Sequence, residues 1–93
     1  MISIKSKREI ELMRKTCELA KSTLEYIEEF VKPGVSTEEL NTLCHEYILK
    51  HGAYPSPLDY HGFPKSVCTS LNEVICHGIP NQNDILKDGD ILN

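Results

Sequence analysis

The chain has 93 residues, of which 40% are hydrophobic and 26% are charged, so it fits one small globular domain over residues 1–93 and excludes an intrinsically disordered chain. Its formal net charge of -4 excludes a general nucleic-acid binder, which would carry a basic face. No apolar run approaches the roughly 20 residues of a membrane span and the first residues lack a secretory-signal pattern, so we expect no membrane partner and a cytoplasmic location.

The first predicted element is a long amphipathic helix over about residues 6 to 31. It opens with the capping-box pattern Ser6-Lys7-Arg8-Glu9. Apolar residues then recur in alternating steps of three and four, and a second apolar row widens this stripe. The main stripe contains Ile10, Met13, Cys17, Ala20, Leu24, Ile27 and Val31, and the flanking row contains Leu12, Leu19 and Tyr26. A coiled coil would use such a stripe, but the broader face favours packing on a sheet.

A second amphipathic helix follows the break at Pro33-Gly34. The capping pattern Ser36-Thr37-Glu38-Glu39 begins it, and its apolar positions have helical spacing over residues 40–48. His51 and Gly52 fit its C-terminal end, because an imidazole can meet the last carbonyls and glycine can turn left-handed. We interpret His45 and His51 as solvated or capping side chains.

The remaining segments are predicted to be extended or turned. Two prolines keep the connector 53–60 from being helical. Two β-branched runs, 66–70 and 74–77, predict a β-hairpin around Leu71-Asn72-Glu73. We predict a loop, one helical turn, a further turn and the start of another strand for the last residues, in the order 81–84, 84–87, 87–90 and 91–93. The fold class is therefore α/β (α+β), with helix faces that need a wider sheet than the hairpin.

The residues able to do chemistry are concentrated between Tyr60 and Pro80, in the stretch YHGFPKSVCTSLNEVICHGIP. His77 lies at a predicted strand end, just before a glycine that lets other groups approach the backbone. Tyr60, His61 and Phe63 are placed to line a small apolar pocket. Ordinary loop anchoring is the alternative role for these three residues.

The four cysteines leave several interpretations open. Without a secretory signal, reduced thiols are favoured over disulfides. No CxxC pair supports a zinc site, although Cys68, Cys76 and His77 could in principle be brought together. A nucleophilic pair of Cys68 and His77 lacks an orienting acid. Because neighbours on a strand face opposite sides, Cys76 is expected in the core if His77 faces a cleft.

The stretch YHGFPKSVCTSLNEVICHGIP resembles the signature region of type I methionine aminopeptidases, and PSPLDY, FVKPGVST and LKDGDILN resemble the same family in the same order. The resemblance implies a pita-bread fold, in which helices cover a curved antiparallel sheet. It also implies removal of the initiator methionine from new polypeptides. Two divalent metal ions (Co, Mn, Fe or Zn), held by carboxylates and one histidine, activate the attacking water in this family.

The resemblance also assigns roles to individual residues. His77 matches the histidine that hydrogen-bonds the substrate near the scissile amide, which makes it the expected catalytic residue. Tyr60, Phe63 and Cys68 match the pocket for the methionine side chain, and such a soft, apolar lining suits a thioether. Two further residues, Asn72 and Val74, match a backbone site for a monovalent cation.

The resemblance places all metal ligands beyond the position that matches Asn93. The acidic residues present do not replace them, since Asp88 and Asp90 flank a turn and Glu38 and Glu39 cap a helix. We therefore expect an N-terminal part of the catalytic domain that binds no metal pair and is inactive alone. The alternative is a non-catalytic module that binds a partner such as the ribosome or a complementary half. A proline-specific peptidase or creatinase-like protein is disfavoured by the motifs YHGFPKSVC and CHGIP.

Overall fold

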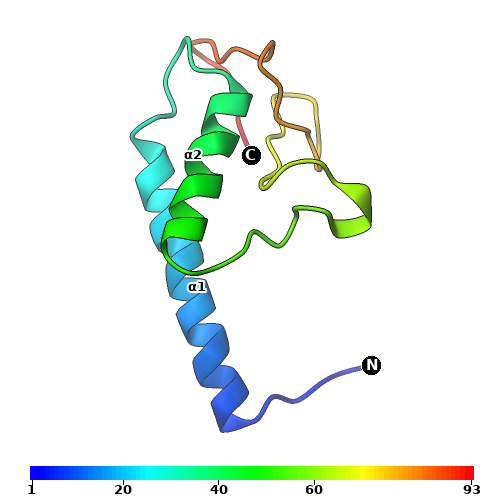
Figure 1. The fold of residues 1–93 in the computed structure, drawn as a ribbon. Helices are drawn as coiled ribbons and strands as arrows, with labels where there is room; N and C mark the ends of the chain where they lie inside the picture. Colours follow the sequence, from blue (N-terminus) through cyan, green and yellow to red (C-terminus); the bar gives the residue numbers. More distant parts are fainter.

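The computed structural model describes residues 1–93 and contains two α-helices and one short 3₁₀-helix. The helices are α1 (Lys7–Glu28), α2 (Thr37–Lys50) and η1 (Tyr60–Gly62). α2 lies alongside the C-terminal half of α1, whereas the N-terminal half of α1 stands clear of the rest of the chain (Figure 1). Neither helix combines the length and apolar character that crossing a bilayer requires.

Both helices begin where the sequence predicts. The Ser6 hydroxyl accepts a hydrogen bond from the Glu9 amide at 3.2 Å, and the Glu9 carboxylate accepts one from the Ser6 amide at 2.9 Å. This complete capping box lowers the pKa of Glu9, chiefly through the bond from the Ser6 amide. The Ser36 hydroxyl likewise accepts from the Glu39 amide at 3.1 Å. These caps satisfy amides that have no partner inside a helix.

The two helices end in different ways. α1 stops at Glu28 rather than near residue 31, because the amides of Phe30 and Val31 bond to carbonyls three residues back and tighten the last turn. α2 stops at Lys50, and the His51 ring hydrogen-bonds the Tyr47 carbonyl at 2.8 Å. This contact confirms the predicted capping role of His51.

The packing between α1 and α2 uses the flanking row of α1 rather than its main stripe. Tyr26 stacks on Tyr47 with ring centroids 4.5 Å apart, and Thr23 is buried on the same side. In the main stripe, Ile10 remains 47% exposed and Leu24 remains 70% exposed. The predicted apolar stripe lies along one face of α1, but most of it is left uncovered by the rest of these 93 residues.

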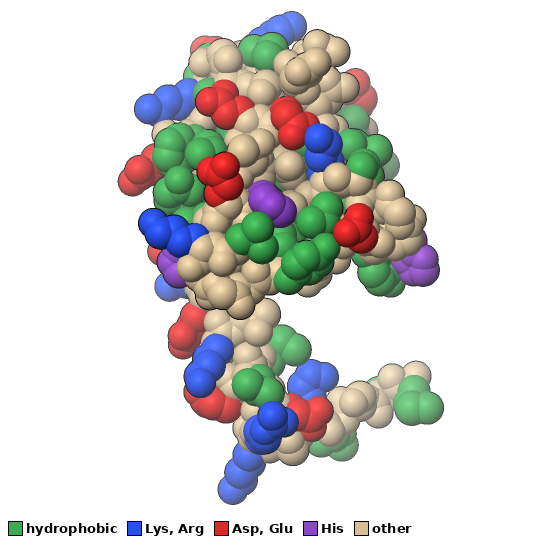
Figure 2. All heavy atoms as spheres, in the orientation of Figure 1, with side chains coloured by type: hydrophobic (Ala, Val, Ile, Leu, Met, Phe, Trp, Pro, Cys, Tyr) green, Lys and Arg blue, Asp and Glu red, His purple; other side chains and the backbone are tan.

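The hydrophobic core is correspondingly small. Leu40, Cys44 and Leu86 form it, and burial raises the pKa of the Cys44 thiol. On the face seen in Figure 2, the free half of α1 carries hydrophobic side chains next to basic and acidic ones. Because buried apolar area drives folding, most of the apolar surface of α1 contributes nothing to stability in this arrangement.

The predicted hairpin over 66–77 is not confirmed, since the chain contains no strand. Ser70 instead exchanges backbone hydrogen bonds with Asn93, at 2.7 and 2.9 Å, and Leu71 forms an isolated antiparallel bridge with Leu92. Asn72 has a φ of 51°, which takes the chain out of an extended path before the second run begins. At Ser70 the predicted extended segment 91–93 therefore takes the place expected for the second run, whereas Thr69 still bonds to Gly78.

The predicted helical turn at 84–87 is wrong. Ile85 forms an antiparallel bridge with Ser36, and backbone bonds of 2.8 Å join Leu86 to Gly34 and to Val35. This extended pairing buries Leu86 to 4% exposure, whereas a lone helical turn would leave its backbone groups unpaired. The predicted turn at 87–90 is confirmed by the bond from the Asp90 amide to the Lys87 carbonyl at 3.1 Å.

Candidate functional site

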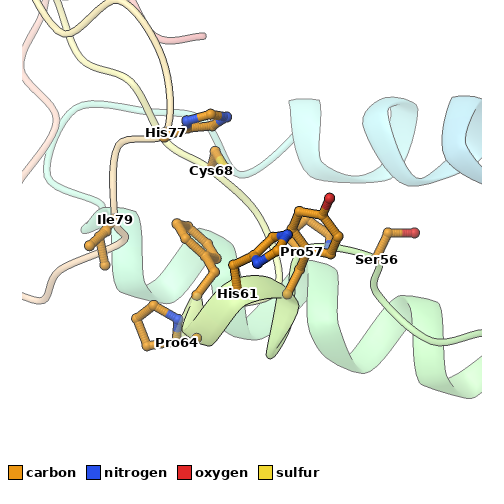
Figure 3. A pocket seen from close by; sticks show the side chains of 10 residues that line it. Ser56, Pro57, His61, Pro64, Cys68, His77 and Ile79 are labelled. Atoms are coloured by element: carbon orange, nitrogen blue, oxygen red, sulfur yellow. The ribbon is translucent and has the colours of Figure 1, made fainter.

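The residues predicted to bind substrate meet in one open pocket of about 720 Å³. Its lining residues are Ser56, Pro57, Tyr60, His61, Gly62, Phe63, Pro64, Cys68, His77 and Ile79. His77 and Cys68 lie together on one side, opposite His61, Pro57 and Pro64 (Figure 3). All four of the predicted side chains, Tyr60, Phe63, Cys68 and His77, are therefore among its walls.

One wall is built from η1 and the turn before it. The Asp59 amide donates to the Phe63 carbonyl at 2.9 Å, and the Phe63 amide donates to the Tyr60 carbonyl at 2.9 Å. Asp59 and His61 have φ values of 65° and 48°, which non-glycine residues rarely adopt. Tyr54 donates a hydrogen bond to the Asp59 carboxylate at 3.1 Å, and this bond raises the pKa of Tyr54. The loop thus turns sharply, and the rings of Tyr60 and Phe63 line the pocket.

The opposite wall depends on close contact between two backbone segments. The Thr69 amide donates to the Gly78 carbonyl at 2.8 Å, and the Gly78 amide donates to the Ser70 hydroxyl at 3.2 Å. A Cβ atom at position 78 would lie 2.0 Å from the Thr69 carbonyl oxygen. His77 itself has a φ of 57°, so strain and tight packing together aim its ring at the pocket.

Cys76 does not join the core as predicted. Its side chain is exposed, because residues 76 and 77 are not part of a strand and the alternation of faces does not apply. All four cysteines are free thiols. No three His, Cys, Asp or Glu side chains lie close enough together to hold a metal ion, so the set of Cys68, Cys76 and His77 is not assembled.

Several pocket residues are not among those predicted from the sequence. Ser56, Pro57 and Ile79 line the cavity, and the only signal for them was their position within or beside the PSPLDY and CHGIP motifs. His45 is half-buried and its Nδ1 atom lies 2.7 Å from the Ser66 hydroxyl, a contact that the predicted solvated or capping role does not include. The polar positions of α2 recur at helical spacing, and that spacing could have revealed this contact.

The predicted cation-binding residues, Asn72 and Val74, lie in a turn that is held by hydrogen bonds and does not line the pocket. The Asn72 side chain donates to the Asp90 carboxylate at 3.1 Å and accepts from the Ile91 amide at 3.0 Å. Hydrogen bonds from the Lys87 amide and from Asn72 lower the pKa of Asp90. The carbonyls of Asn72 and Val74 accept no hydrogen bond, so they are free to meet a ligand.

The pocket therefore combines an apolar lining with two imidazoles, those of His61 and His77, on opposite sides. Aromatic and proline surfaces beside the sulfur of Cys68 suit a flexible apolar or thioether side chain. His77 can donate to or accept from a polar group at the edge of such a ligand. No carboxylate belongs to the lining, so these residues can hold and orient a substrate without supplying a general acid or base of that kind.

Known proteins resemble the chain over almost its whole length. The sequence pattern of the family described as Metallopeptidase family M24 matches residues 11–93. The methionine aminopeptidase of Escherichia coli (strain K12) is 56% identical over 93 residues, which are 99% of this chain and 35% of that protein. The corresponding protein of Buchnera aphidicola is 53% identical over 90 residues, which are 97% of this chain and 34% of that protein. The chain spans about a third of the length of the curated relatives it matches.

Solved structures give the same result. Methionine aminopeptidase from Rickettsia prowazekii matches with a TM-score of 0.94 and 52% identity, over 99% of this chain and 37% of that one. The enzyme from Thermotoga maritima matches with a TM-score of 0.95 and 33% identity, over the same shares of the two chains. The chain thus has the fold of the matching 37% of these aminopeptidases, which confirms the predicted fold family.

Proposed function

The chain belongs to metallopeptidase family M24, and on that basis we propose that it forms part of a methionine aminopeptidase that removes the initiator methionine from new polypeptides. In this proposal residues 1–93 are an incomplete catalytic domain that contributes the pocket for the substrate's first side chain. Newly made polypeptides as substrates would place the protein in the cytoplasm.

The observation that carries the proposal is the meeting of Tyr60, Phe63, Cys68 and His77 in one pocket. In this proposal the first three contact the methionine side chain, where a soft sulfur and aromatic faces favour a thioether. His77 hydrogen-bonds the substrate near the scissile amide. Such a bond accelerates the reaction if it strengthens as charge develops on that amide.

The residues present do not fit the two divalent metals of the family. Asp88 and Asp90 flank a turn, Glu38 pairs with Lys65, and no metal-binding group is formed. No metal-dependent step is assigned to these residues, and we propose that the 93 residues alone do not hydrolyse peptides. The free carbonyls of Asn72 and Val74 are proposed to bind a monovalent cation, for which backbone oxygens are suitable ligands.

Methioninamide is the simplest probe of the proposed pocket, because it carries the thioether and the amine without a further residue. We expect it to shift the ¹H–¹⁵N resonances of Phe63, Cys68 and His77 with a Kd on the order of millimolar, given its few heavy atoms. Alaninamide is the matched control and is expected to bind more weakly. Equal shifts from both ligands, or methioninamide shifts confined to other residues, would contradict the assignment of this pocket to the methionine side chain.

A non-catalytic module that binds a complementary half is the second candidate, and the bare stripe of α1 favours it. Ile10 and Leu24 are exposed although they continue a regular apolar row, and only three hydrophobic residues form the core. Burying a few hundred Å² of such surface is worth several kcal/mol at about 25 cal/mol per Å². The proposed partner is the remaining two thirds of the aminopeptidase fold, which this chain does not span.

This second candidate can be tested by mixing. We expect the chain to form a one-to-one complex with the part of the E. coli relative that it does not cover, measured by size-exclusion chromatography with light scattering. Leu24→Glu should weaken that complex about tenfold or more, because it would bury a charge. Lys21→Glu, an exposed change on the same helix outside the stripe, is the control. A complex equally weakened by both changes, or no complex, would contradict docking through the stripe.

A further inference from the structure

One face of α2 is tied by polar side chains to the segment that joins the two pocket walls. Glu38 pairs with Lys65 at 2.6 Å, and the Nδ1 atom of His45 lies 2.7 Å from the Ser66 hydroxyl. Between them, the side-chain oxygen of Asn41 accepts two backbone hydrogen bonds, from the amides of residues 66 and 67, at 2.9 and 3.2 Å. The three α2 residues follow the spacing i, i+3, i+7, which places them on one side of the helix.

Asn41 is the central contact of this row. It is 8% exposed and Ser66 is 3% exposed, so water does not compete for these bonds. Neither the Ser66 amide nor the Val67 amide has any other acceptor. Losing the Asn41 oxygen would therefore leave two amides unsatisfied, one of them buried, and that loss costs more than the bonds themselves.

The segment held by these contacts, residues 65–67, lies directly between two walls of the pocket. Phe63 precedes it on the side of η1, and Cys68 follows Val67 on the side of His77. We propose that Asn41 is a positioning residue for the pocket: by holding the backbone of residues 66 and 67 against α2, it fixes the distance between the Phe63 wall and the Cys68 wall. Asn41 itself is not among the lining residues, so it acts through the segment rather than on a ligand.

The chemistry of the contact distinguishes two replacements of Asn41. Only its oxygen takes part, since its NH₂ group makes no hydrogen bond. A carboxylate oxygen accepts from the same two amides, so Asn41→Asp should preserve the position of the segment. Leucine is of similar size but accepts nothing, so Asn41→Leu should release it.

Thr37→Val offers a matched control on the same helix. The Thr37 hydroxyl also joins α2 to a loop by two hydrogen bonds, donating to the Asn81 carbonyl at 3.0 Å and accepting from the Asn81 amide at 2.9 Å. It is fully buried, and its loop is not the segment that joins the pocket walls. The two variants thus lose the same number of bonds at different places.

The experiment measures the alkylation rate of Cys68 by iodoacetamide in the full 93-residue chain, with the exposed Cys76 as internal reference and peptide mass mapping to separate them. Asn41→Leu is expected to raise the Cys68 to Cys76 rate ratio about tenfold, and to raise hydrogen exchange of the Ser66 and Val67 amides similarly. Asn41→Asp should stay within about twofold of the unaltered chain, as should Thr37→Val.

An unchanged ratio in Asn41→Leu, an equal rise in Thr37→Val, or a failure of Asn41→Asp to restore the ratio would each overturn the positioning role. The positioning role rests on the pocket of the proposed aminopeptidase, but the alkylation rates and the hydrogen exchange are measured without any ligand. If methioninamide fails to bind the unaltered chain, the proposed function is contradicted, while the alkylation comparison still decides the role of Asn41.

Discussion

Gly78→Ala is expected to displace His77 from the pocket and to destabilise the chain by about 3 kcal/mol. The new methyl group would meet the Thr69 carbonyl oxygen at 2.0 Å, and the neighbouring atoms within 3.0 Å are also backbone. Backbone cannot rotate away as a side chain can. The two segments must separate, which breaks the bond from the Thr69 amide to the Gly78 carbonyl and the bond from Gly78 to Ser70.

Urea unfolding gives the stability change, and the ring-proton resonances of His77 report its surroundings. Gly89→Ala is the control, because Gly89 has a φ of 94° and nothing within 4 Å of an added Cβ. It should cost only the strain of a left-handed alanine, about 1–2 kcal/mol, and leave the His77 resonances in place. If the two variants were equally stable and both kept the His77 resonances, the close approach at Gly78 would not be what positions His77.

Features that depend on neighbours in sequence were predictable. The serines at positions 6 and 36 cap their helices because a capping pattern needs only residues three apart. The pocket residues were predictable for a different reason, since short motifs identified the family and so named Tyr60, Phe63, Cys68 and His77. Their meeting in one cavity is an observation of the structure alone.

Features that depend on distant partners were not predictable. Two extended runs close in sequence suggest a hairpin, but the better partner of Leu71 is Leu92. A left-handed asparagine such as Asn72 is also typical of hairpin turns, so the local sequence does not reveal that Ser70 pairs with Asn93 instead. The local sequence predicts a helical turn at Ile85 because nothing near it reveals its bridge to Ser36.

Burial was predicted less well than secondary structure. The main stripe of α1 has the strongest periodicity in the chain, yet Leu24 is exposed and Thr23 is buried. Periodicity shows which residues could share a face, but the available partner decides which face is covered. Here α2 presents Tyr47 to Tyr26, and aromatic stacking at 4.5 Å fixes the contact on the flanking row.

His77→Ala is expected to have the largest effect on activity, in a fusion where residues 1–93 are continued by the part of the E. coli relative that they do not cover. We expect kcat/KM for a Met-Ala peptide to fall by about 10²–10³, the usual result of removing one donor that acts in the transition state. His77 lines the pocket beside Cys68, and its backbone is held by the packing of Gly78 on Thr69. Alanine at position 77 removes the imidazole and leaves that packing intact.

The same fusion with His51→Ala separates a catalytic effect from loss of a histidine in general. His51 bonds to the Tyr47 carbonyl at the end of α2 and does not belong to the pocket lining. It should change kcat/KM by less than about threefold, although losing this cap costs some stability. Because His77 is proposed to act at the scissile amide, its loss should lower kcat more than it raises KM. A His77→Ala fusion with unchanged kcat and a raised KM would place the imidazole in ground-state binding of the methionine, and the role assigned to it here would be wrong.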